Sequence, residues 1–142
     1  MTNGEITAAS GVSLAESIAE MQAAGQPYSV VPGVVFAVAG GLLAIAWAAA
    51  TLAPALSPSG WSALAVWAAI LAFGAPAYFF ASFGNMNAVG DTFYEWNAEA
   101  AFRLVVPLYL TSAVAALVAV IALATGAARS RSREPASGSP RR

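Results

Sequence analysis

Three long apolar runs without a charged residue constrain the fold of this chain more than any other feature. They extend over residues 32–53, 61–83 and 104–125. Each run matches the roughly 20 residues that an α-helix needs to cross the hydrocarbon core of a bilayer. A backbone in lipid must pair its own N–H and C=O groups, and a helix does so within one segment. We therefore predict an all-α integral membrane protein with three transmembrane helices.

The composition also indicates that lipid is the main solvent of the chain. Of its 142 residues, 59% are hydrophobic and 9% charged, whereas roughly a quarter are charged in a soluble domain. We divide the chain into an N-terminal extramembrane segment (residues 1–30), a transmembrane domain (31–126) and a basic tail (127–142). The tail consists mainly of Arg, Ser, Pro, Gly and Ala, which cannot build a core, so we predict that it is disordered.

A short amphipathic helix is predicted in the N-terminal segment, over about residues 14–24. Ser13 and Glu16 have the spacing of a capping box. Apolar residues then recur at helical spacing as far as Met21, and Gly25 supplies a stop. We expect this helix to rest on the membrane surface or on the transmembrane helices. Docking of a partner through the same apolar stripe is the alternative.

Proline and glycine residues predict where the spans are interrupted or end. Loops are predicted over residues 54–60 and 84–90, which are rich in Pro, Gly, Ser and Asn. Pro76 removes a backbone hydrogen bond and should kink the second span, and Pro107 should bend the third span near its start. Gly126 is predicted to end the third span.

The segment before the third span carries the most regular charge pattern. Asp91, Glu95, Glu99 and Arg103 are each four residues apart, which would place them along one side of a helix. Thr92 and Glu95 fit a capping box, so we predict that this helix begins near Thr92. Glu99 precedes Arg103, which is the favourable order for an ion pair.

We interpret these four charged residues as a solvated helix face and as a candidate contact for a partner. No metal site is predicted, because no loop of alternating oxygen ligands accompanies the carboxylates. Acid–base catalysis by paired carboxylates is disfavoured, because so little of the chain lies outside the membrane to build a pocket.

Three missing residue types exclude several kinds of chemistry. Without His and Cys, the chain offers no imidazole or thiolate ligand for haem, zinc or an iron–sulfur cluster. Without Lys, it cannot form the Schiff base that retinal or pyridoxal phosphate requires. No charged residue lies inside a span, where it could mark a proton relay. We predict that the protein is not an enzyme and has no catalytic residue, cofactor or metal. The Ala-rich, Lys-free composition favours a prokaryotic source.

Aromatic residues are concentrated next to the charged segment. Phe93, Tyr94, Trp96 and Phe102 lie within ten positions. Such rings commonly form a belt at the membrane interface. The alternative is that they bind an apolar ligand such as a quinone or a lipid tail.

Small residues recur every fourth position in the first span. Gly33, Ala37 and Gly41 form one such series, and small residues let helices in lipid approach closely. We interpret the series as a packing face. Packing within the same chain is the favoured interpretation, and contact with a partner subunit is the alternative.

The basic residues predict the orientation in the membrane. All but one of the six lie in the last fourteen positions, namely Arg129, Arg131, Arg133, Arg141 and Arg142. Arginines that flank a span tend to stay in the cytoplasm, where each gains about 1 kcal/mol near anionic lipid headgroups. We predict a multi-pass protein of the plasma membrane with a cytoplasmic C-terminus and an outside N-terminus. Five arginines without aromatic residues do not indicate nucleic-acid binding.

These features favour a non-catalytic accessory or assembly subunit of a larger membrane complex, with lipid and other membrane subunits as partners. Two alternatives remain open. Small size, three spans and a charged cytoplasmic tail resemble the architecture of phage holins, which implies self-association and membrane permeabilisation. The aromatic cluster instead suggests a protein that binds lipid or quinone.

Overall fold

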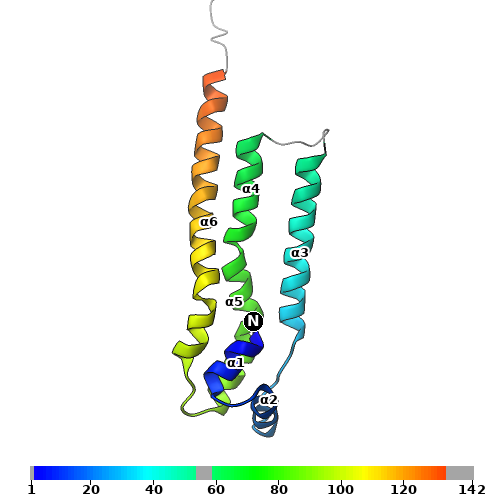
Figure 1. The fold of residues 1–142 in the computed structure, drawn as a ribbon, viewed down its shortest axis with the longest axis vertical. Helices are drawn as coiled ribbons and strands as arrows, with labels where there is room; N and C mark the ends of the chain where they lie inside the picture. The colour runs from blue at the N-terminus through cyan, green and yellow to red at the C-terminus, as the bar shows by residue number, and fades with distance from the viewer. Residues whose placement is uncertain (1, 54–58, 134–142) are drawn as a thin grey trace, which may run out of the picture.

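The computed structural model describes residues 2–53 and 59–133, and every regular element within them is an α-helix (Figure 1). The helices are α1 (Thr2–Ser10), α2 (Leu14–Ala23), α3 (Val31–Leu52), α4 (Gly60–Ala72), α5 (Gly74–Thr92) and α6 (Ala98–Arg133). The predicted all-α fold class is confirmed.

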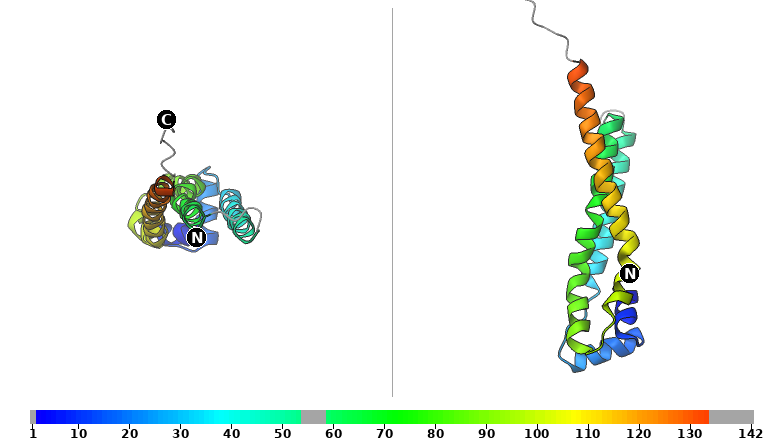
Figure 2. Two further views of the ribbon diagram at one scale, coloured as in Figure 1. Left: turned by 90° about the horizontal axis from the view of Figure 1, so that it is seen from above. Right: turned by 90° about the vertical axis from the view of Figure 1, so that its left-hand side faces the viewer.

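Three helical segments are long and apolar enough to cross a membrane. They are α3, the joined helices α4 and α5 over Gly60–Thr92, and α6 over Ala98–Ser132. The α4–α5 rod and α6 run side by side, and α3 stands on the outside of that pair (Figures 1 and 2). The predicted number of spans is confirmed. The predicted loop over residues 54–60 lies largely outside the described residues.

Small side chains bring α4 and α6 together. Ala65 and Ala68 of α4 are buried, as are Ala115, Ala119 and Ala122 of α6. Lipid tails are as apolar as these helices, so close backbone approach and dispersion contacts hold them together instead of a hydrophobic driving force. The interface between α4 and α6 is the most extensive one in the described bundle.

The second span is interrupted at Phe73, one turn before Pro76. Pro76 has no N–H, so the carbonyl group of Ala72 loses its partner in the helix. The hydroxyl group of Ser112 on α6 bridges the break. It accepts a 3.0 Å hydrogen bond from the N–H of Ala75 and donates one of 2.9 Å to the carbonyl of Leu71. The expected distortion near Pro76 is therefore present, and α6 supports it.

The predicted loop over residues 84–90 is wrong, because α5 continues through this segment to Thr92. Tertiary contacts outweigh the poor helix propensity of its Gly and Asn residues. Asn85 is buried, and its side-chain amide accepts a 3.0 Å bond from the Ser29 N–H and donates one of 2.8 Å to the Ser29 carbonyl. Ala88 and Val89 are buried against the N-terminal helices.

The predicted end at Gly126 is also wrong, because α6 continues to Arg133. Gly126 lies against Trp61, where an added Cβ would stand 3.4 Å from the Trp61 Cβ atom. One turn later the guanidinium of Arg129 lies 4.8 Å from the centre of the Trp61 ring, a cation–π contact. Residues 127–133 of the predicted disordered tail are thus helical, and residues 134–142 lie outside the described part. Pro107 lies inside α6, which continues through it.

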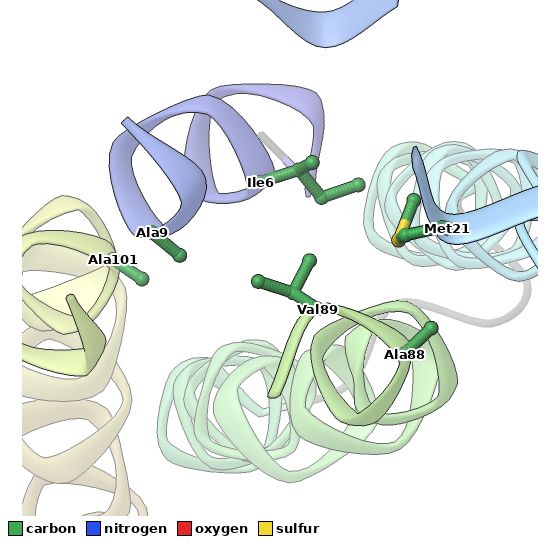
Figure 3. Close-up of a cluster of buried hydrophobic side chains, with 6 residues drawn as sticks. All are labelled: Ile6, Ala9, Met21, Ala88, Val89 and Ala101. Carbon is green, nitrogen blue, oxygen red and sulfur yellow. The ribbon is translucent and has the colours of Figure 1, made fainter. Parts of the chain in front are cut away.

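The predicted amphipathic helix is confirmed as α2, and the N–H of Glu16 donates to the Ser13 hydroxyl group at 3.3 Å. The sequence does not predict α1, which has almost no amphipathic pattern. This helix packs against both α5 and α6. It shares with them and with α2 a hydrophobic cluster, shown in Figure 3, that consists of Ile6, Ala9, Met21, Ala88, Val89 and Ala101. The N-terminal segment is thereby joined to the transmembrane helices at one end of the bundle.

Candidate functional site

The docking of α1 carries an acidic side chain into the protein. Glu5 is only 3% exposed. The hydroxyl group of Tyr78 on α5 donates a 2.7 Å hydrogen bond to Oε1 of Glu5. Tyr78 is itself 3% exposed, and its ring packs edge-on against Phe36 of α3. One tyrosine thus connects the N-terminal helix to two of the three spans.

Burial raises the pKa of the Glu5 carboxyl above its ordinary value of 4.5, and the hydrogen bond from Tyr78 opposes part of this shift. Removing a carboxylate from water disfavours its charged form, whereas a donated hydrogen bond favours that form. Because desolvation is the larger effect, the neutral acid is more favoured in this site than it would be in water.

Glu5 forms part of the wall of a cavity of about 290 Å³ between α1, α5 and α6. Half of the lining residues are aromatic. The lining residues are Glu5, Tyr78, Phe79, Ser82, Phe83, Met86, Trp96, Ala98, Ala101, Phe102, Val105 and Tyr109. Pairs of these rings are in contact, with centroid distances of 5.5 Å for Phe79–Phe83 and 5.9 Å for Phe102–Tyr109. Such a cavity suits an apolar or aromatic body with a small polar group.

The polar lining of the cavity is sparse and contains no basic residue. Besides Glu5 it consists of the hydroxyl groups of Tyr78, Ser82 and Tyr109 and the indole of Trp96. The Ser82 hydroxyl group donates to the Phe79 carbonyl at 3.2 Å, so that donor is already engaged within α5. An anionic ligand group would face a carboxyl and no basic side chain of the lining.

The structure divides the predicted aromatic cluster. Trp96 and Phe102 line the cavity. Phe93 packs against the hydrophobic cluster, and Tyr94 is 99% exposed. The aromatic density therefore indicates the right region, but two of the four rings point elsewhere.

The four regularly spaced charged residues do not lie on one helix face as predicted. Asp91 lies at the end of α5, Glu95 lies in the linker, and only Glu99 and Arg103 lie on α6. Their predicted ion pair is confirmed at 2.6 Å, but both side chains are about three-quarters exposed, where such a pair contributes roughly 0–1 kcal/mol.

A different capping residue explains this error. The N–H of Ala100 donates to Oδ1 of Asn97 at 2.9 Å, so Asn97 caps α6. The Asn97 N–H donates to the Ala9 carbonyl of α1 at 2.7 Å. Thr92, the predicted cap, instead donates its hydroxyl group to the Ala88 carbonyl within α5. Asn is a favoured N-cap residue, so Asn97 is the sequence signal for the start of α6. The Thr92–Glu95 spacing is a second possible signal, and it predicts the wrong start.

The small-residue series on α3 lies mostly open. Gly33 is half-buried, whereas Ala37 and Gly41 are exposed. A Cβ added at Gly41 would have no heavy atom of the described chain within 4 Å, and no residue of α3 is buried. This helix offers a packing face that the chain itself does not fill beyond its first turns.

The described basic residues at the end of α6 lie away from the cavity. Arg129 and Arg131 are exposed on the last turns of α6, at the opposite end of the bundle from α1 (Figure 1). Arg133 ends that helix, and Arg141 and Arg142 lie outside the described residues. Within the described part, no three His, Cys, Asp or Glu residues gather as a metal site would require.

Comparison of the chain with protein-family models, curated proteins and solved structures finds no match. The function must therefore be argued from the cavity and the helix faces themselves.

Proposed function

We propose that this small multi-span membrane protein binds an amphiphilic or apolar small molecule in the cavity between α1, α5 and α6. The observation that carries the proposal is the buried Glu5 carboxyl in a wall made otherwise of aromatic, aliphatic and small side chains. A purely structural cavity in a lipid-facing bundle has no need of a carboxyl group, and burying one is costly. A bound polar group would offset that cost.

The ligand would enter from the bilayer. Phe79, Phe83 and Phe102 line the cavity and are each between 45% and 57% exposed. Their rings form an apolar rim that a lipid-soluble molecule can cross without passing through water. The protein would act without catalysis, as a carrier, sensor or reservoir for this molecule.

A cavity-filling substitution tests this proposal. Ala98 lines the cavity near the start of α6, so Ala98→Trp should fill it. Ala113→Trp makes the same change on an exposed face of α6 and serves as control. Native mass spectrometry of protein purified in mild detergent should find a retained small molecule in the wild type and the control but not in Ala98→Trp. Equal retention in all three proteins would refute the proposal.

An accessory role in a larger complex is the second candidate, and the open face of α3 supports it. A partner span that covers Ala37 and Gly41 would pack backbone to backbone. Gly41→Leu should then abolish co-purification of another polypeptide, and Ala46→Leu, on another side of α3, should not. Isolation of the wild type without any partner would count against this role. The holin-like alternative predicts growth arrest and loss of membrane potential when the chain is expressed alone.

We also propose that α1 and α2 lie outside the cell and that the end of α6 lies in the cytoplasm. The exposed Arg129 and Arg131 at the end of α6 support this orientation. Labelling of a single introduced cysteine with a membrane-impermeant reagent tests it in intact cells. The cysteine in Glu16→Cys should react with the reagent, and the cysteine in Ser132→Cys should not.

A further inference from the structure

The charge of the cavity limits the head group that a ligand can carry. Glu5 is the only lining residue whose side chain can carry a full charge near neutral pH. Arg103, the basic residue nearest in sequence to the lining, is exposed and already paired with Glu99. A phosphate, sulfate or carboxylate head would therefore meet a carboxyl group, and no basic side chain lines the cavity to hold it.

The rings of the wall favour the opposite charge. The face of an aromatic ring attracts a cation, and several rings around one site form the cage that recognises quaternary ammonium groups. Six aromatic residues line this cavity, from α5, from the linker after it and from α6. Carboxyl group and rings thus agree in the sign of the charge they attract.

One hydrogen bond and one nearby charge of the protein act on the Glu5 carboxyl. Oε1 accepts the hydrogen bond from Tyr78, and the positive charge of the chain's N-terminus lowers the pKa of the carboxyl somewhat. Burial has the larger effect, because Glu5 is only 3% exposed and forms part of the cavity wall. A buried carboxylate is stabilised by an opposite charge at close range. A ligand in the cavity could supply a further positive charge.

We infer that the cavity selects an amphiphile with a cationic head group, an amine or a quaternary ammonium, whose positive charge lies against the Glu5 carboxylate. This inference rests on the proposed binding function. The aromatic wall would surround the head group, and the tail would pass between α5 and α6 into the bilayer.

Binding of such a cation is coupled to a proton. Burial raises the pKa of Glu5, so the carboxyl keeps its proton to a higher pH than a carboxyl group in water does. Cation binding converts this acid to a carboxylate and releases its proton to water. The hydrogen bond from Tyr78 and the positive charge of the chain's N-terminus act on the same carboxyl and oppose part of this shift of its pKa. Affinity for the cation should therefore increase with rising pH.

The test compares two probes of equal chain length, octyltrimethylammonium and octanol. Binding to wild-type protein in lipid nanodiscs of neutral lipid is measured by calorimetry at pH 5 and pH 8. At pH 8 the wild type should bind the cation about tenfold more tightly than the alcohol, which is the ratio expected for one added favourable charge contact. The preference should decrease at pH 5. In Glu5→Gln it should be lost at both pH values, while alcohol binding is retained.

The outcomes separate the two proposals. Binding of neither probe by the wild type would overturn both the proposed function and this inference. Equal binding of the two probes at pH 8 would overturn the inference alone. If Glu5→Gln does not fold, the two wild-type measurements still test the inference. A cation preference that is equal at pH 5 and pH 8 would exclude the Glu5 carboxylate as the counter-ion.

Discussion

The hydroxyl group of Tyr78 hydrogen-bonds to the Glu5 carboxyl at 2.7 Å, although 73 residues of sequence separate them. This contact joins the first helix of the chain to the middle of the second span. It is accompanied by the apolar cluster around Ile6 and Val89, so polar and apolar contacts hold α1 in the same place. The cavity exists because α1 is docked there.

Tyr78→Phe should weaken the docking of α1. The substitution leaves the ring in place and removes the donor to Glu5, at a cost of about 1–2 kcal/mol for a buried hydrogen bond. Limited proteolysis in mild detergent should cleave the N-terminal helix faster, and the thermal unfolding midpoint should fall. Tyr94→Phe is the matched control, because Tyr94 is 99% exposed. Equal proteolysis of both variants would show that the hydrogen bond does not hold α1.

The docking of α1 in the empty protein should weaken as pH rises. The folded state raises the pKa of Glu5, so it binds the Glu5 proton more tightly than an undocked helix does. The contribution to stability is then fully present below pH 4.5 and is lost as pH rises through the folded-state pKa. A spin label at Ala8→Cys should become more mobile between pH 4.5 and pH 8. Glu5→Gln should remove this pH dependence, and an unchanged profile would assign it to another group.

Ser112→Ala should destabilise the interrupted second span. It removes the hydroxyl group that pairs with the Ala75 N–H and the Leu71 carbonyl. The carbonyl keeps its bond from the Phe73 N–H, but an unpaired buried N–H costs about 1–3 kcal/mol. Thermal unfolding in detergent should show the loss. Thr111→Ala, its neighbour on the exposed side of α6, removes only a local bond to the Pro107 carbonyl and should change the midpoint little. Similar midpoints for the two variants would mean that Ser112 does not support the break.

Asn85→Ala should loosen the start of α3. The amide of Asn85 exchanges two hydrogen bonds with the backbone of Ser29, just before α3 begins at Val31. Hydrogen exchange at the first amides of α3 should accelerate in this variant. Asn87→Ala, an exposed neighbour on α5, should leave these amides unchanged. If Asn85→Ala also leaves them unchanged, the two bonds do not fix the start of α3.

Hydrophobic runs predict the spans well because their signal is local. The bilayer requires about 20 apolar residues in a row, and α3 lies within two residues of its predicted bounds at either end. The errors occur where distant residues decide. Residues 84–90 have the composition of a loop, but the contacts of Asn85 and Val89 with the N-terminal segment keep them helical. Gly126 ends no helix, because α6 packs against Trp61 there.

Only part of the site can be predicted from the sequence, for the same reason. Trp96 and Phe102 stand out through aromatic density within a few positions. Glu5 does not, since its hydrogen-bond partner Tyr78 lies 73 residues away in an apolar run. The regular spacing from Asp91 to Arg103 was the stronger local pattern, but the cap at Asn97 interrupts it.

The place of Ala9 against Ala101, in the cluster of Figure 3, bears on the order of events during synthesis. Chains fold as they emerge, with N-terminal parts usually first. Here α1 leaves the ribosome before α6, but the surface of α6 on which it packs does not exist until the third span has been made. α1 can therefore dock only after α6 has been made, and the cavity is among the last parts of the molecule to form.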